Sequence, residues 1–256
     1  MGIRYNTSIV RGGLVLHLDA ANKKSYPGSG TVWKDLSGNG NDGTLVNGVD
    51  YSSDNKGTMV FDGVDDRFQT STQVDLSYTN KISVDLWCKV LNYKEISGST
   101  SMVFEASPNF NGSSTGLYAG IGEDSSPTFR GEGVQYPISL NIRGNAGYNL
   151  YGFDKTLVND LEWHHWCCIF DKSISGSNPI ESRLFIDGIE RSVSVFTTLR
   201  SNNTNNFGND FWYMGSRSSG AGPSNVTISN FKIYNRVLSP QEIQQNFEAT
   251  RGRYGI

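Results

Sequence analysis

Apolar and polar residues alternate with a period of two along much of the chain. Residues 82–90 show the pattern best, with one set of side chains on each side of a strand: Ile82, Val84, Leu86 and Cys88 against Ser83, Asp85, Trp87 and Lys89. Successive strand residues point to opposite faces, so the pattern predicts sheets that are buried on one face and polar on the other. Strands are expected at 14–19, 43–48, 58–62, 66–70, 80–90, 100–106, 116–122, 137–142, 162–171, 182–187, 190–196, 210–215 and 226–235.

The connections between these segments are rich in turn-forming residues. Asp187 and Gly188 separate two strand segments, and such a pair strongly indicates a hairpin because both residues tolerate a left-handed backbone. The Ser-, Asn- and Gly-rich segments are expected to be surface loops: 107–115, 123–134, 172–180, 200–210 and 216–225. Many short strands joined by tight turns predict an all-β fold, a sandwich of two antiparallel sheets.

A single short helix is expected near the C-terminus. Residues 239–242 read Ser-Pro-Gln-Glu, a capping box with proline at the first helical position. Leu238 and Ile243 have the spacing of a hydrophobic staple, and Ile243 and Phe247 form an apolar stripe. The helix should therefore pack on the sandwich through this stripe, and Gly252 is expected to end it.

Composition narrows the classes of partner. The 256 residues include 29 glycines and carry a formal net charge of −3. Nucleic-acid binding needs a concentrated basic face, which the sequence lacks, so no nucleic-acid partner is expected. No apolar run approaches the roughly 20 residues of a membrane helix. The first residues contain no apolar segment of the signal-peptide kind, so we expect no secretory signal. We expect residues 1–12 to form an N-terminal arm and residues 13–256 a single domain.

The histidines and cysteines are expected to be buried structural residues. His164 and His165 are adjacent on a predicted strand, so they face opposite ways and cannot chelate one ion from the same face. Cys167 and Cys168 cannot easily pair with each other for the same reason, and Cys88 makes the set odd. Free thiols fit synthesis in a reducing cytoplasm.

Two groups of oxygen-bearing side chains have the chemistry of a metal site. The loop 35–43 is rich in Asp, Asn and Gly, and residues 62–66 contain three carboxylates. Ca²⁺ prefers several hard oxygen ligands on flexible loops. The candidate ligands of a structural Ca²⁺ are Asp35, Asn39, Asn41, Asp62, Asp65 and Asp66. The alternative is that the loop residues hold Asx turns and that Arg67 is the counter-charge of the acidic group.

One aromatic cluster has the character of a sugar site. Saccharides stack an apolar face on Tyr or Trp, while Asn, Asp and Arg bind their hydroxyl groups. Tyr148 and Tyr151, with Arg143 and Asn145, form the most ligand-like group, which we expect on a loop or sheet edge. The alternative is that these aromatic residues pack in the core or between subunits.

Six segments of the chain occur in the order of a known family. They are LHLDAAN (16–22), W-x-D-L-S-G-N-G-N-D-G (33–43), FDGVDD (61–66), WHHWCCIFD (163–171), RLFIDGIERS (183–192) and ISNFKIYNRVLSPQEIQQNFEATRGRYG (228–255). Together they resemble laminin-G-like domains of the concanavalin A-like lectin/glucanase type, in the version found as single-domain structural proteins of tailed bacteriophages. The resemblance implies a jelly-roll β-sandwich. It also implies that the loop 35–43 and the acidic group meet at one rim, where Asn230 replaces an Asp of relatives.

The resemblance includes enzymes, but their catalytic motif is missing here. The glucanases of this fold carry Glu-x-Asp-x-x-Glu on one strand, with the two reacting carboxyl groups about 5 Å apart. The nearest match has Phe185 in place of the first Glu, and its Asp187 and Glu190 flank a hairpin turn. We therefore expect no catalytic residues and no enzymatic activity.

The resemblance implies a virion protein. We expect an accessory domain on a phage capsid or tail, made in the host cytoplasm, that binds carbohydrate on the host surface. Its expected partners are other virion proteins and host glycans, with self-association as a further expectation. The alternatives are a decoration or assembly protein without a glycan ligand, and a glycoside hydrolase, which lacks its motif. Because one fold hosts many functions, the fold alone does not choose between them.

Overall fold

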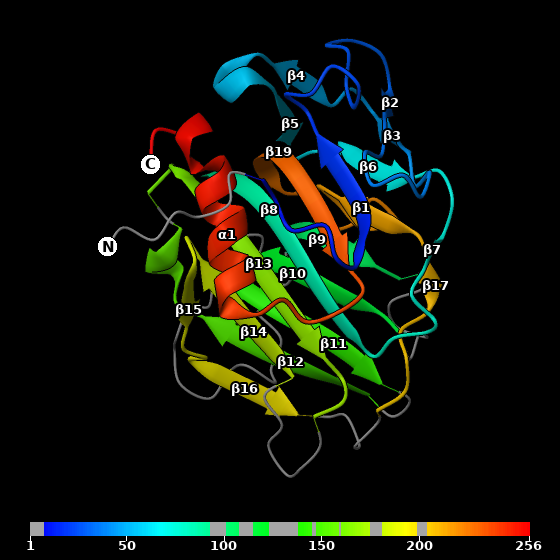
Figure 1. The fold of residues 1–256 in the computed structure, drawn as a ribbon, viewed down its shortest axis with the longest axis vertical. Helices are drawn as coiled ribbons and strands as arrows, with labels where there is room; N and C mark the ends of the chain where they lie inside the picture. The colour runs from blue at the N-terminus through cyan, green and yellow to red at the C-terminus, as the bar shows by residue number, and fades with distance from the viewer. Residues whose placement is uncertain are drawn as a thin grey trace.

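Two large sheets form the body of the protein. The computed structural model describes residues 8–92, 101–107, 115–122, 138–144, 147–158, 160–174, 181–198 and 204–256. Within these residues, a sheet of eight strands and a sheet of nine pack face to face, and a third sheet has two strands (Figure 1). All the strand pairs are antiparallel, so the expected all-β, jelly-roll-like sandwich is confirmed.

The eight-stranded sheet is built around two long central strands. Its order is β15 (Ile189–Arg191), β14 (Ser182–Ile186), β13 (Trp163–Asp171), β8 (Lys81–Asn92), β19 (Asn225–Tyr234), β5 (Thr58–Asp62) and β4 (Asp50–Ser52). The first half of β19 pairs with β5, and its second half pairs with the eighth strand, β1 (Leu14–Asp19). The strand β19, near the C-terminus, therefore pairs with two strands from the first quarter of the chain.

The nine-stranded sheet includes two strands that the sequence pattern did not predict, β2 and β12. Its order is β16 (Val195–Thr198), β12 (Gly147–Phe153), β11 (Ile138–Gly144), β10 (Leu117–Ile121), β9 (Ser101–Ala106), β18 (Trp212–Met214), β6 (Arg67–Thr70), β3 (Gly43–Val46) and β2 (Val32–Trp33). The two-stranded sheet pairs β17 (Asn209–Asp210) with β7 (Val74–Asp75). Three short 3₁₀ turns complete the described elements: η1 (Asp54–Lys56), η2 (Lys155–Leu157) and η3 (Arg251–Arg253).

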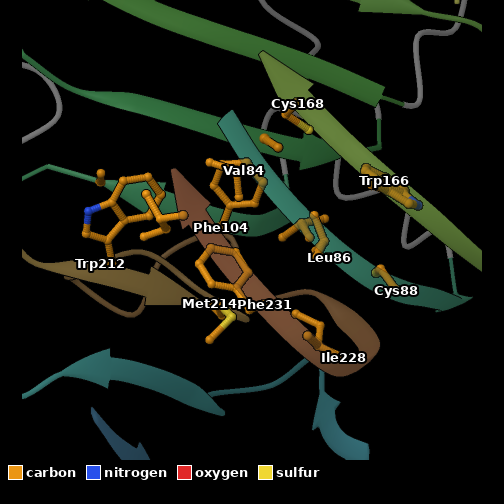
Figure 2. Packing of buried hydrophobic residues seen from close by; sticks show 14 of the residues in the cluster. Val84, Leu86, Cys88, Phe104, Trp166, Cys168, Trp212, Met214, Ile228 and Phe231 are labelled. Atoms are coloured by element: carbon orange, nitrogen blue, oxygen red, sulfur yellow. The ribbon is translucent and has the colours of Figure 1, made fainter. Parts of the chain in front are cut away.

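The core lies between the two large sheets. Figure 2 shows Phe104 of β9, Trp212 of β18 and Phe231 of β19 packed together at its centre. The ring centroid of Phe104 lies 5.6 Å from that of Phe231 and 6.1 Å from that of Trp212. Burial of each such side chain contributes roughly 1.5–3 kcal/mol. The predicted apolar side of β8, which includes Leu86, belongs to the same core cluster.

The opposite side of β8 is also buried, contrary to the predicted polar surface. Asp85 and Trp87 point away from the core, yet both are fully buried. The helix α1 (Pro240–Thr250) crosses this face over β8 and β13 (Figure 1). It docks through Ile243, which packs with Phe185, and through Phe247, which packs with Trp87. The pattern predicted this helix and its stripe correctly, but it did not show which strands the helix covers.

The start of α1 is as predicted, and its end is not. Ser239 Oγ accepts a hydrogen bond from the Glu242 amide (3.3 Å), and the Glu242 carboxylate accepts one from the Ser239 amide (2.9 Å). The predicted capping box is therefore confirmed. The helix ends at Thr250, before the expected glycine, because Arg251 stays in the right-handed region and the chain tightens into η3.

The hairpin at Asp187 and Gly188 is confirmed. Ile186 pairs with Ile189, and the two turn residues between them have φ values of 56° and 78°. Both angles are left-handed, as a type I′ turn requires. Two expected strands are each divided: 190–196 into β15 and β16, and 210–215 into β17 and β18.

The segment 8–12 is held against α1. The Val10 amide donates to Asn246 Oδ1 (2.8 Å), and the Val10 carbonyl accepts from the Tyr234 hydroxyl (3.0 Å). The side chain of Val10 is buried with Ile243. The rest of the expected arm, residues 1–7, lies outside the described residues. The described helices include none with the length and apolar character needed to cross a bilayer.

Candidate functional site

One cross-strand row on the nine-stranded sheet points away from the core. Its members lie opposite one another on adjacent strands: Gln69, Tyr213, Glu105, Tyr118, Asn141 and Leu150. Their neighbours along the strands, such as Phe104 and Ile142, belong to the core cluster. Because strand residues alternate between faces, the row lies on the outer face of the sheet. We use the name outer-face cluster for Glu105, Tyr118, Ser139, Asn141, Arg143, Tyr148 and Arg217.

Glu105 is the most unusual residue of the outer-face cluster. Its side chain is only 1% exposed, and its Oε2 atom has no hydrogen-bond partner. The nearest cation is the Arg217 guanidinium, whose Nε lies 3.9 Å from Oε2, too far for a hydrogen bond. Burial raises the pKa of Glu105 to about 7, although Arg217 and Arg143 act to lower it. Near neutral pH this carboxyl group can therefore either donate or accept a hydrogen bond.

Two further polar atoms on the same outer face have no hydrogen-bond partner. These are Asn141 Oδ1 and Ser139 Oγ, both on β11 and both on residues that are at least nine-tenths buried. Buried polar atoms in proteins are nearly always paired, so each exception needs an explanation. Across the described strands β9 and β11, the outer face therefore offers three polar atoms that a ligand could pair.

Aromatic rings and arginines alternate around these polar atoms. The Arg217 guanidinium lies 5.6 Å from the ring centre of Tyr118, and the Arg143 guanidinium lies 5.6 Å from that of Tyr148. Met102, Tyr118 and Leu150 form an apolar cluster of their own, with Tyr148 packed against it. The face therefore combines charged hydrogen-bond donors and polar acceptors with a cluster of buried apolar side chains.

The structure brings together two of the four predicted sugar-binding residues. Arg143 and Tyr148 are paired across β11 and β12, and both belong to the outer-face cluster. The prediction for Tyr151 is wrong. Its side chain is fully buried in the core, and its hydroxyl accepts a hydrogen bond from the Glu181 amide (3.1 Å). The expected loop is the strand β12, so residues three apart face opposite ways. Asn145 lies outside the described residues.

Sequence reasoning missed Glu105, Tyr118 and Asn141. The signal was present for Glu105, which is the one charged residue within the apolar segment 101–106. A lone acid in such a strand is buried or functional, because isolated charges are costly to bury. The apolar neighbours Leu140 and Ile142 indicate that Asn141 points away from the core. Only the order of the strands shows which residues lie beside it.

The side chains of the loop 35–43 make the hydrogen bonds of Asx turns, which was the alternative to a Ca²⁺ site. Asp35 Oδ1 accepts from the amides of His17 and Ser37 (2.9 and 2.8 Å), and Oδ2 accepts from the Asn41 amide (3.0 Å). The side-chain amides of Asn39 and Asn41 each donate to the Val15 carbonyl (3.0 Å). These side chains hold the loop against β1 through Asx-type hydrogen bonds, and all three of the predicted ligands take part.

The two predicted metal groups do not meet at one rim. Gly43, the last residue of the loop, pairs with Thr70, whereas Val46 at the other end of β3 pairs with Arg67, which follows the acidic group. The loop and the acidic group therefore lie at opposite ends of β3. The expectation from the family resemblance is wrong on this point, because four residues of extended strand separate the two groups.

The acidic group keeps the geometry of a small cation site. Asp62, Asp65 and Asp66 each offer one oxygen within 4.8 Å of the others. Asp66 is buried, and Asp66 Oδ2 accepts from the Asp62 amide (3.0 Å). Burial raises the pKa of Asp66, and so do the nearby carboxylates of Asp62 and Asp65. A bound cation would relieve this repulsion, so Ca²⁺ binding at these three residues stays a prediction.

The residues of the degenerate glucanase motif have structural partners. Asp187 Oδ2 lies 2.7 Å from His164 Nδ1, and Asp187 Oδ1 accepts from the His165 amide (2.9 Å). Glu190 lies on β15, 3.7 Å from Arg183. The turn at Asp187 separates the two carboxylates, so they do not share one face of a strand as retaining hydrolysis requires.

The expectation that His165 is a buried structural residue is confirmed. Its Nε2 atom lies 2.9 Å from Asp85 Oδ2, and both side chains are fully buried. Lys232 Nζ donates to Asp85 Oδ1 (2.6 Å), and Asn246 of α1 donates to Asp85 Oδ2 (2.9 Å). Burial alone would raise the pKa of Asp85, but Lys232 and His165 hold it well below its usual range.

The comparisons agree with this fold. A sequence model described as the concanavalin A-like lectin/glucanases superfamily matches residues 62–244, which is most of the chain. The chain belongs to this family. No curated protein matches the sequence.

Several solved structures share the fold at low identity. The receptor binding domain of the botulinum neurotoxin C/D mosaic serotype matches with a TM-score of 0.63 and 11% identity over 93% of this chain and 52% of that one. The binding domain of Paraclostridial Mosquitocidal Protein 1 matches with a TM-score of 0.61 and 14% identity over 92% of this chain and 52% of that one. A sialidase of Trypanosoma rangeli matches with a TM-score of 0.56 and 18% identity over 94% of this chain and 33% of that one. The chain thus spans about half the length of the two toxin domains and a third of the sialidase.

Proposed function

We propose that the protein is a non-enzymatic carbohydrate-binding domain and that the outer-face cluster is its ligand site. The observation that carries this proposal is the set of three buried, unpaired polar atoms on Glu105, Ser139 and Asn141. A saccharide supplies what such a surface lacks, because its hydroxyl groups both donate and accept, while its C–H face packs on tyrosine rings. Tyr118 lies between Glu105 and Asn141 in the cross-strand row, and Tyr148 lies opposite Arg143 on the adjacent strand.

The relatives in fold support a binding role. Two of the matching structures are named as binding or receptor binding domains, which at 11% and 14% identity shows a shared fold. Fold likeness does not transfer a ligand, so the residues on the outer face of this chain carry the proposal. Weak binding at one site suffices when many copies act together, since linked sites gain avidity.

The geometry favours binding over hydrolysis. A glycosidase needs two carboxyl groups on either side of the bond that it cleaves. Glu105 has the raised pKa of a general acid, but the other members of its cross-strand row are Gln69, Tyr213, Tyr118, Asn141 and Leu150. A lone acid without a nucleophile or base in that row fits recognition of a sugar better than its cleavage.

We further propose that the domain is displayed on the capsid or tail of a tailed phage, with other virion proteins as partners. The support is the resemblance carried by the six ordered segments. Mass spectrometry of purified particles, followed by gold labelling with antibody, should place the protein on the virion. Its absence from particles would contradict this assignment without affecting the sugar site.

A glycan array on the purified protein tests the binding proposal. We expect reproducible hits that are lost in Tyr148→Ala and in Asn141→Ala. Tyr78→Ala is a suitable control, because Tyr78 is an exposed tyrosine (58%) that lies outside the outer-face cluster. An array without hits would favour the alternative of a decoration protein that uses the fold only for contacts between subunits.

A further inference from the structure

The charge summed over the members of the outer-face cluster differs in sign from the net charge of the whole chain. The chain has a net charge of −3, but the charged members of the outer-face cluster are Arg143, Arg217 and Glu105. Because burial raises the pKa of Glu105 to about 7, its negative charge is only partly present at neutral pH. The cluster therefore carries a positive charge of between one and two units.

The charged groups that face Glu105 from the described neighbouring strands are both positive. Arg217 follows β18 and Arg143 lies on β11, and both act on the Glu105 carboxyl group. The other titratable groups around it are tyrosines, Tyr118 on β10 and Tyr213 on β18, which are neutral near pH 7. A bound anion would therefore meet two guanidinium groups and a carboxyl group that can be protonated.

We propose that the ligand of the outer-face cluster is an acidic saccharide, bound through a carboxylate or sulfate group placed between Arg143 and Arg217. This inference rests on the proposed carbohydrate-binding function. Guanidinium groups bind such anions with charge-assisted hydrogen bonds, which are stronger than those to neutral hydroxyl groups. The rings of Tyr118 and Tyr148 hold the guanidinium groups from one side, 5.6 Å from each ring centre.

Proton linkage follows from the position of Glu105. An anion close to this carboxyl group favours its protonated form, so binding takes up a proton. The affinity for an acidic saccharide should therefore rise as the pH falls from 8 to 6. A neutral sugar that donates a hydroxyl to the Glu105 carboxylate would show the opposite dependence. Glu105→Gln mimics the protonated group and should remove most of the pH dependence.

The test uses pairs of glycans that differ only in charge. Sialyl-lactose and lactose form one pair, trigalacturonic acid and its methyl ester a second, and a sulfated oligosaccharide and its desulfated form a third. They are printed on an array, and the pair with the strongest signal is then titrated by calorimetry at pH 6 and pH 8. We expect the acidic member to bind more tightly, and Arg143→Ala and Arg217→Ala each to weaken it by about tenfold, as for loss of one charge-assisted hydrogen bond.

Arg183→Ala is the matched control. Arg183 lies on the eight-stranded sheet, is partly exposed, and has its guanidinium 5.8 Å from the ring centre of Phe185. It should leave the affinity unchanged. Equal or tighter binding of the neutral members would overturn this inference and leave the proposed function intact. Silence of every glycan, acidic and neutral, would contradict the proposed function itself.

Discussion

His165 on β13 and Asp85 on β8 form a fully buried hydrogen-bonded pair beneath the C-terminal helix. The distance between His165 Nε2 and Asp85 Oδ2 is 2.9 Å, and Asn246 of α1 donates to the same carboxylate oxygen. Lys232 of β19 donates to the other oxygen, and Asn246 also accepts from the Val10 amide, so this one carboxylate links three strands, the helix and the N-terminal segment. A buried polar group of this kind restricts the helix to a single docked position.

Asp85→Ala should therefore destabilise the protein strongly. The substitution leaves the Lys232 ammonium buried without its partner, and loss of one member of a buried ion pair costs about 3–5 kcal/mol. Urea denaturation followed by tryptophan fluorescence measures the loss. Glu190→Gln, which breaks the surface pair with Arg183, should change stability little. Equal stability of Asp85→Ala and the wild type would show that α1 docks without this network.

The buried Glu105 predicts an unusual dependence of stability on pH. Its pKa is raised from 4.5 to about 7 in the folded state, so its contribution is fully present below pH 4.5 and is lost as the pH rises through 7. The wild type should lose up to about 3 kcal/mol relative to Glu105→Gln between pH 5 and pH 8. Parallel stability curves for the two proteins across that range would contradict the assignment.

The capping box offers a smaller and more local test. Ser239→Ala removes the acceptor of the Glu242 amide, and loss of such a cap costs about 1 kcal/mol. For a domain of this size, the melting temperature should fall by about 2–4 °C. Ser239→Asp, which restores an acceptor at the same position, should recover most of that loss. A melting temperature that is lowered equally by both variants would show that the cap does not stabilise α1.

Calcium binding at the acidic group can be tested by metal removal. If Asp62, Asp65 and Asp66 hold Ca²⁺ in the folded state only, the ion stabilises by about 2.7 kcal/mol at a hundredfold excess over its Kd. Melting temperature should then rise with millimolar Ca²⁺ and fall with chelator, and Asp65→Asn should reduce the difference. Glu162→Gln, an exposed acid elsewhere, is the control. Identical melting with Ca²⁺ and with chelator would exclude a stabilising site.

The parts of the fold that sequence predicted are those determined by neighbouring residues. The capping box lies within four residues, the turn at Asp187 and Gly188 depends on backbone preference, and the apolar side of β8 is a local alternation. In each case the interacting atoms are close in the chain, so the pattern alone contains the information.

The parts that sequence did not predict depend on distant residues. The strand β12 reads Gly-Tyr-Asn-Leu-Tyr-Gly-Phe, where glycine and asparagine resemble a loop, yet β11 and β16 pair with it on both sides. Asp85 appeared to face solvent because its partners His165 and Lys232 lie 80 and 147 residues away. The predicted position of Tyr151 was wrong because β12 was not recognised as a strand. Without a strand, no alternation assigns Tyr148 and Tyr151 to opposite faces.

The fixed position of Val10 also determines how the domain would be oriented on a support. Val10 and α1 pack together on the outer side of the eight-stranded sheet, so the first described residues and the C-terminal helix lie on the same side of the molecule. The outer-face cluster lies on the opposite side of the sandwich, beyond both sheets and the core between them. A domain that is attached through either end therefore turns the cluster away from its support, toward the surrounding medium. Neighbouring copies held in the same way would expose parallel faces, which is the arrangement that multivalent attachment to a flat surface requires.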